Sequence, residues 1–186
     1  MKKYAITAVV AVVAALSIFV LGGEYNSLKG VELNVQTQQS QIENQLQRRA
    51  DLIPNLVASV KGYMQHEERV LTEVTEARTQ LMNATSLEAK AAADTALTAA
   101  LGRLIAVSES YPDLKANTQF IELMREIAGS ENRIAVARRD YNNAVQEYNL
   151  AAATFPSNIF AKILGFGEIK PFEADASAHE APKVDL

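Results

Sequence analysis

Apolar residues recur at steps of three and four through residues 24–155, and only Pro54 and Pro112 interrupt this stretch. Such spacing places apolar side chains on one face of a helix, whereas a half-buried strand would need apolar and polar residues to alternate. The sequence therefore predicts an all-α fold that is built from amphipathic helices.

The three-four spacing divides residues 24–155 into separate helices. The first is predicted over residues 28–49, and Asp51 is expected to cap a second, with Pro54 in its first turn and its apolar face extending to Leu81. A polar N-cap and a proline in the first turn are common at helix starts. We therefore expect the chain to change direction near Asp51.

Two more helices are predicted downstream. Thr85 and Glu88 have the spacing of a capping box and are expected to open the third, which ends at Tyr111-Pro112. The fourth covers residues 117–154 and has a three-four heptad repeat of the coiled-coil kind. Because short connections join the helices, we predict that residues 24–156 form an antiparallel four-helix up-and-down bundle.

An uninterrupted apolar run, AITAVVAVVAALSIFVL, occupies residues 5–21 and follows Lys2 and Lys3. A helix over residues 4–21 would be about 27 Å long, which is close to the hydrocarbon thickness of a bilayer. We predict that residues 1–23 are one uncleaved N-terminal transmembrane helix. A signal peptide cleaved after Gly22 is the alternative, although its apolar region is usually shorter.

The charges beside this run predict its orientation. Lys2 and Lys3 precede it, while Glu24, Lys29 and Glu32 follow it, so the positive-inside rule places the N-terminus in the cytoplasm. The helical domain would then lie on the opposite side of the membrane. The absence of cysteine excludes disulfide and thiol chemistry.

The balance of charge argues against nucleic acid as a partner. The chain carries 18 Lys and Arg residues against 22 Asp and Glu residues, a formal net charge of −4. Phosphate binding requires clustered cations, but here the cations are dispersed among carboxylates along the helices.

The C-terminal part is predicted to contain two segments. Residues 157–173 are rich in apolar and aromatic residues and are expected to cap the base of the bundle or to dip into the lipid surface. Residues 174–186 are acidic and aperiodic, which predicts a disordered tail. The residues expected to form the membrane-proximal apolar face are Ile159, Phe160, Ile163, Leu164 and Phe166.

Several blocks resemble the LemA family of bacterial membrane-anchored proteins. Residues 46–67 read LQRRADLIPNLVASVKGYMQHE, residues 111–116 read YPDLKA and residues 131–142 read ENRIAVARRDYN. The later blocks are Tyr148-Asn149, Phe155-Pro156, Gly165-Phe166 and Phe172-Glu173. The resemblance implies an N-terminal anchor in the inner (cytoplasmic) membrane followed by a four-helix bundle, which would lie on the periplasmic or extracytoplasmic side. It supplies no catalytic residues, and it implies a protein partner in the envelope, such as a membrane protease system.

Charged residues on the apolar faces are candidates for a structural or a functional role. They are Arg49, Glu67, Arg78, Glu131 and Arg138. Buried charges are costly unless they are paired, so these side chains are expected to meet across helices and to fix the helix register. The alternative is a polar groove for a ligand or an extended peptide.

That groove would use charged residues near the start of the predicted second helix. Its best candidates are Arg48, Arg49 and Asp51, with Glu131 and Lys115 nearby. Two functions therefore remain open. One is a membrane-anchored scaffold or adaptor of the bacterial cell envelope, in which self-association is possible, and the other is a binding module that uses this polar cluster.

The sequence contains no motif for cofactor or metal chemistry. His66 and Glu67 lack the second histidine of an HExxH motif, and His179 falls in the predicted tail. No G-x-S-x-G and no glycine-rich phosphate loop is present. We therefore predict no metal, no cofactor and no enzymatic activity.

Overall fold

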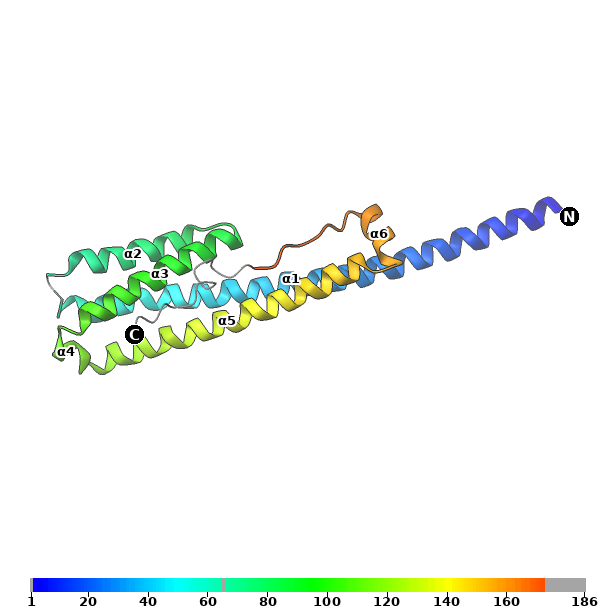
Figure 1. Ribbon diagram of the computed structural model, residues 1–186. Coiled ribbons are helices and arrows are strands. Elements are labelled where there is room, and N and C mark those ends of the chain that lie inside the picture. Colours follow the sequence, from blue (N-terminus) through cyan, green and yellow to red (C-terminus); the bar gives the residue numbers. More distant parts are fainter. Residues whose placement is uncertain (1, 65, 173–186) are drawn as a thin grey trace, which may run out of the picture. The chain divides into compact units, whose positions relative to one another are not determined.

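The computed structural model describes residues 2–64 and 66–172, and it describes their side chains except in residues 2–10 and 13–20. All regular secondary structure within these ranges is helical, which confirms the all-α prediction (Figure 1). The helices are α1 (Lys2–Lys61), α2 (Glu68–Asn83), α3 (Leu87–Ser108), α4 (Pro112–Lys115), α5 (Thr118–Ala153) and α6 (Ser157–Leu164).

Helix α1 contradicts the predicted break near Asp51. It passes through Asp51 and Pro54 without interruption and ends at Lys61. A proline inside a helix leaves the carbonyl four residues earlier, here that of Ala50, without its usual N–H donor. In the structure Arg78 of α2 donates its Nε–H to the Ala50 carbonyl at 2.9 Å. A side chain distant in sequence therefore replaces the missing helical hydrogen bond.

The start of α3 also differs from the prediction by one residue. Its N-cap is Ser86, whose Oγ accepts a hydrogen bond from the Ala89 N–H at 3.1 Å. Ser86 has an extended backbone with φ −104° and ψ 159°, which is the N-cap conformation. The helix predicted after Thr85 is present, but Ser86 rather than Thr85 caps it.

The chain divides into two compact units. One contains residues 40–138, that is, the second part of α1, helices α2, α3 and α4, and α5 up to Arg138. Its buried apolar side chains lie on the helix faces that the three-four spacing predicts. They include Ile42, Leu46, Ile53, Leu56, Val60, Leu71, Val74, Leu81, Leu97, Leu101, Leu104, Leu114, Phe120, Ile127 and Ile134.

The other unit contains the described residues up to Gln39 and those from Arg139 onward. Its buried side chains come from α1, α5 and α6, and they include Leu28, Val35, Tyr141, Tyr148 and Ala161. Helix α6 ends at Leu164, and its C-cap Gly165 adopts the left-handed conformation with φ 80°. Glycine adopts this conformation without steric cost, so it allows the chain to turn sharply after α6.

The predicted anchor coincides with the beginning of α1, which is helical from Lys2 and continues beyond residue 23 without a break. Among the residues whose side chains are described, Leu87–Ser108 is one helix with the length and apolar composition of a membrane span. It is α3, and its Leu97 and Leu104 are fully buried in the unit of residues 40–138, so we interpret it as a core helix. The transmembrane role of residues 1–23 stays a prediction, and residues 174–186 lie outside the described part of the chain.

Candidate functional site

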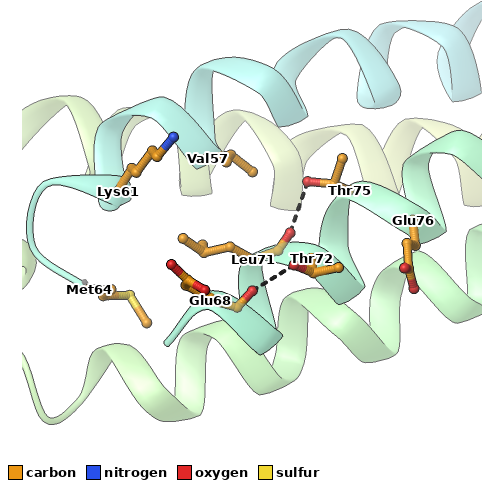
Figure 2. A pocket seen from close by; sticks show the side chains of 8 residues that line it. All are labelled: Val57, Lys61, Met64, Glu68, Leu71, Thr72, Thr75 and Glu76. Carbon is orange, nitrogen blue, oxygen red and sulfur yellow. Dashed lines mark hydrogen bonds between the residues drawn. The ribbon is translucent and has the colours of Figure 1, made fainter. Parts of the chain in front are cut away.

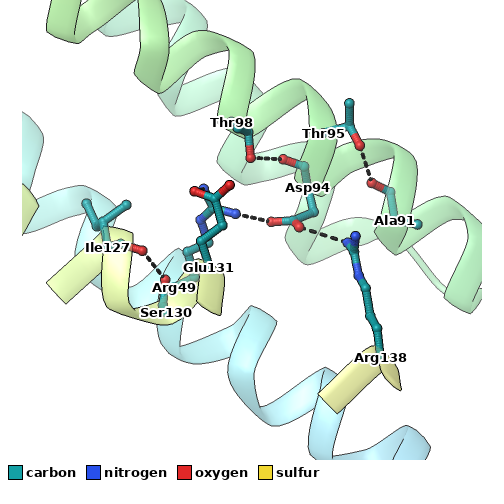
Figure 3. Close-up of polar contacts among 9 residues, drawn as sticks. All are labelled: Arg49, Ala91, Asp94, Thr95, Thr98, Ile127, Ser130, Glu131 and Arg138. Carbon is teal, nitrogen blue, oxygen red and sulfur yellow. Dashed lines mark hydrogen bonds and ion pairs between the residues drawn. The ribbon is translucent and has the colours of Figure 1, made fainter. Parts of the chain in front are cut away.

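Three charged side chains meet inside the unit of residues 40–138, and we call Arg49, Asp94 and Arg138 the buried charge cluster (Figure 3). The Arg49 Nη1 lies 2.8 Å from Asp94 Oδ1, and the Arg138 Nη2 lies 2.9 Å from Asp94 Oδ2. Arg49 is 1% exposed and Asp94 is 4% exposed. One carboxylate of α3 therefore connects α1 and α5.

The buried charge cluster carries one more positive than negative charge, and the nearby Glu131 carboxylate offsets it. Two guanidinium groups face one carboxylate, and Glu131 Oε2 lies 3.8 Å from the Arg49 Nη2 at the exposed edge. Burial raises the pKa of the Asp94 carboxyl, although Arg49 and Arg138 act in the opposite direction. Because both Asp94 oxygens already accept hydrogen bonds from arginine, the cluster holds helices together rather than presenting a free charge.

The structure separates the other residues of the predicted polar cluster. Arg48 pairs with Glu126 at 2.9 Å, and Asp51 accepts a hydrogen bond from Gln47 at 2.9 Å. Only Arg49 and Glu131 approach each other, and the Glu131 side chain is 59% exposed rather than buried. The predicted groove residues Arg48, Arg49, Asp51 and Glu131 therefore do not converge on one groove.

The remaining predicted residues have separate partners as well. Glu67 accepts a hydrogen bond from the Tyr111 hydroxyl at 3.3 Å, and Lys115 pairs with Glu109 on the surface. Arg78 donates to the Ala50 carbonyl as described above. These contacts satisfy side chains and backbone groups within the fold.

Sequence reasoning missed Asp94, which is the centre of the buried charge cluster. Its position carries a signal, since Asp94 lies three residues after Ala91 and three before Leu97, on the face that was predicted to be apolar. A single acidic residue on that face is the partner that buried arginines require. This spacing would have identified it.

An open depression of about 530 Å³ lies at the end of the same unit, between α1 and α2 (Figure 2). Its lining residues are Val57, Lys61, Met64, Glu68, Leu71, Thr72, Thr75 and Glu76. The two threonine hydroxyls donate to the carbonyls of Glu68 and Leu71 within α2.

No group of three or more His, Cys, Asp or Glu side chains within the described residues could hold a metal ion.

A second polar arrangement lies in the other unit, where an extended segment follows α6. We call residues 167–172 the tail segment. The Asn149 Nδ2 donates to the Ile169 carbonyl at 2.7 Å, and the Ile169 N–H donates to Asn149 Oδ1 at 3.0 Å. Asn142 makes the same pair of bonds with Phe172, at 2.9 and 2.7 Å. Each asparagine amide thus binds both main-chain groups of one residue.

Two tyrosines precede these asparagines and add hydrogen bonds to the same segment. The Tyr148 hydroxyl donates to the Gly167 carbonyl at 2.8 Å, and the Tyr141 hydroxyl lies 3.5 Å from the Lys170 carbonyl. We call Tyr141-Asn142 and Tyr148-Asn149 the YN ladder of α5. Each of these hydrogen bonds is to a main-chain atom of the tail segment.

The five residues of the predicted apolar face are divided between half-buried and exposed positions. Ile159, Leu164 and Ile163 are exposed, Ile163 to 71%, while Phe160 and Phe166 are half-buried. The Phe166 ring lies 5.8 Å from the ring of Tyr25 on α1.

A hydrogen bond fixes the beginning of α6 against α1. The Ser157 hydroxyl donates to Glu24 Oε2 at 2.7 Å. Beside this contact Phe155 is 75% exposed. Three large apolar side chains, Phe155, Ile159 and Ile163, therefore lie exposed on and beside a short helix that is held at Glu24.

Comparison with known proteins identifies the family. The chain is 28% identical over 194 residues to the magnetosome protein MamQ 2 of Paramagnetospirillum magneticum, covering 90% of this chain and 71% of that protein. It is 28% identical over 173 residues to the protein LemA of Metamycoplasma hominis, covering 90% of this chain and 75% of that protein. A profile of the LemA family matches residues 38–186, and the chain therefore belongs to the LemA family.

Proposed function

We propose that this protein is a membrane-anchored scaffold or adaptor of the bacterial cell envelope. The observation that supports this function best is the exposed apolar surface at α6, formed by Phe155, Ile159 and Ile163. Ser157 holds this surface at Glu24, three residues after the apolar run of residues 5–21. Three helical residues correspond to about 4.5 Å, so α6 would lie at the height of the lipid headgroups.

The composition of α6 suits such a position. A short helix with exposed apolar side chains and a lysine, here Lys162, is typical of a segment that lies in the membrane interface. The opposite side of α6 contributes the buried Ala161 to its own unit. We infer that α6 forms a second, shallow contact with the bilayer beside the predicted transmembrane helix.

The arrangement of helices supports a scaffold. Within residues 40–138, contacts connect α1 with α2 through Arg78, and both α1 and α5 with α3 through Asp94. We infer that these helices form an antiparallel up-and-down bundle. The relatives are called magnetosome protein MamQ and protein LemA, which are not names of enzymes, and this agrees with a protein that acts by binding others.

Tryptophan fluorescence tests the membrane position directly, because the chain contains no tryptophan. We would introduce Val12→Trp, Leu33→Trp or Ile163→Trp, each at an exposed position, into the full chain in liposomes with brominated lipids. Strong quenching is expected at position 12, shallow quenching at 163 and none at 33. Position 33 is the control, since it lies twelve residues beyond the apolar run, or about 18 Å along the helix.

The two possible negative results of the quenching experiment have different meanings. Quenching at 12 without quenching at 163 would leave the anchor intact but disprove the contact through α6. The absence of quenching at 12 would disprove the anchor itself.

The side of the membrane is tested with a single cysteine, since the chain has none. Ser110→Cys places a thiol in the exposed turn between α3 and α4. We expect a membrane-impermeant maleimide to label it in intact cells, because the helical domain is proposed to lie on the periplasmic or extracytoplasmic side of the inner membrane. Labelling only after lysis would place the helical domain in the cytoplasm and exclude a partner that lies on the periplasmic or extracytoplasmic side.

A further inference from the structure

The YN ladder and the tail segment share a common spacing. The two asparagines, Asn142 and Asn149, are seven residues apart, which is about 10.5 Å along α5. Their partners Ile169 and Phe172 are three residues apart, which is about 10 Å along an extended chain. The match allows both asparagines to bind one extended segment that runs antiparallel to the helix.

Recognition in the YN ladder depends on the backbone of the tail segment. Asn142, Asn149 and Tyr148 all bind main-chain N–H or carbonyl groups. Glu168 and Lys170 have exposed side chains. A backbone-directed site of this kind accepts an extended peptide much as a sheet edge accepts an added strand.

Two glycines and little buried apolar surface would allow the tail segment to leave the YN ladder while the helices stay folded. Between α6 and Ile169 the chain contains Gly165, in the left-handed conformation, and Gly167. Little apolar surface holds the segment, because among its side chains Ile169 and Phe172 are only half-buried and the others are exposed. Its attachment therefore depends mainly on hydrogen bonds.

We propose that the YN ladder is a binding site for an extended peptide and that it accepts the tail segment of a second copy of this chain. A second copy offers the same segment with the same register, so every hydrogen bond of the intramolecular arrangement can form between two chains. Exchange of an identical element is a low-cost route to a dimer. The tail segment is thus an internal ligand that can be replaced by its counterpart.

Energy transfer between two singly labelled full-length chains in detergent tests this exchange. One chain carries a donor dye on Lys170→Cys in the tail segment, and the other carries an acceptor on Asn143→Cys of α5. Both positions are exposed, and the native chain has no other thiol. We expect transfer that rises with total concentration and is abolished by an excess of unlabelled chain.

Two matched variants identify the surface that is responsible. Asn142→Leu with Asn149→Leu in the acceptor chain removes four hydrogen bonds, so association should weaken at least about tenfold. Ile169→Pro in the donor chain removes one N–H donor of the tail segment and leaves α5 unchanged, which keeps the test valid if the double variant does not fold.

Two results would overturn the proposal. One is the absence of transfer between chains at all concentrations while circular dichroism shows intact helices. The other is transfer that remains equally strong in both variants, because the chains would then associate through a different surface, such as the apolar face of α6.

Discussion

The Nε–H of Arg78 on α2 donates to the carbonyl oxygen of Ala50 on α1 at 2.9 Å, where Pro54 deprives that carbonyl of its helical donor. Ala50 is fully buried, so water cannot take over this role. An unsatisfied buried carbonyl is costly, and a proline inside a helix normally bends or breaks it. Arg78 therefore allows α1 to continue to Lys61.

We expect Arg78→Ala to lower the free energy of unfolding by about 1–3 kcal/mol, because the Ala50 carbonyl loses its donor. The cost should be smaller in a Pro54→Ala background, since an alanine at position 54 can supply the backbone N–H. Chemical denaturation of the four chains in this double-mutant cycle would measure the coupling. Arg69→Ala is the control on the same helix, and its exposed pair with Glu73 should contribute less than about 1 kcal/mol. Equal effects of Arg78→Ala in both backgrounds would refute this account.

Removal of the Asp94 carboxylate should destabilise the protein more than removal of the Arg78 side chain. Asp94→Ala would leave the buried Arg49 without its carboxylate, and such a loss typically costs about 3–5 kcal/mol. Glu131→Gln should cost less than about 1 kcal/mol, since that side chain is largely exposed and 3.8 Å from Arg49. Thermal and urea unfolding would compare the two variants. A larger loss of stability for Glu131→Gln than for Asp94→Ala would show that Asp94 is not the main partner of Arg49.

Substitutions in the tail segment should act through its backbone. Ile169→Pro removes the N–H that donates to Asn149 and should release the segment, whereas Ile169→Ala keeps that donor and should leave it attached. A spin label on Lys170→Cys reports the difference as a gain in mobility for the proline variant alone. Similar mobility in both variants would mean that the Ile169 side chain, and not its main chain, holds the segment.

Alkaline pH should weaken the attachment through Tyr148. Burial raises the pKa of its hydroxyl, the Glu32 carboxylate raises it further, and Lys29 acts in the opposite direction. The pKa is thus higher in the folded than in the unfolded chain. The contribution of the hydroxyl to stability is complete below about pH 10 and disappears as pH rises through the raised pKa, because a phenolate cannot donate to the Gly167 carbonyl.

The difference in melting temperature between the native chain and Tyr148→Phe measures this effect. It should shrink as the pH rises above about 10, while the titration of the other tyrosines affects both chains equally. A difference that stays constant over this range would show that the Tyr148 hydroxyl does not titrate in the folded state.

Burial in the helices followed from local pattern, which is why the apolar faces could be predicted. Leu28, Val35 and Ile42 are buried as the three-four spacing requires. We predicted a helix break at Asp51 because the residues around Pro54 disfavour a continuous helix. The prediction was wrong because the compensating hydrogen bond from Arg78 forms only after α2 has packed against α1. Long-range compensation of this kind has no signature in the neighbouring residues.

The polar contacts were harder to predict than the core. The charged residues of α1 and α5 were recognised as requiring partners, but their common partner Asp94 lies in α3. The YN ladder was missed although the sequence YNNAVQEYN repeats its pair after seven residues. That repeat places Asn142 and Asn149 on one face of a helix, yet a helix pattern alone does not reveal that an extended segment will bind there.

The YN ladder also bears on how this part of the protein can evolve. Replacing residues between Ile169 and Phe172 leaves the bonds of their backbone to Asn149 and Asn142 in place, provided that the N–H donors remain. Inserting or deleting one residue there changes the distance between the two bound residues by about 3.3 Å and separates one of them from its asparagine. Natural selection should therefore tolerate drift in composition but resist any change in the length of this segment.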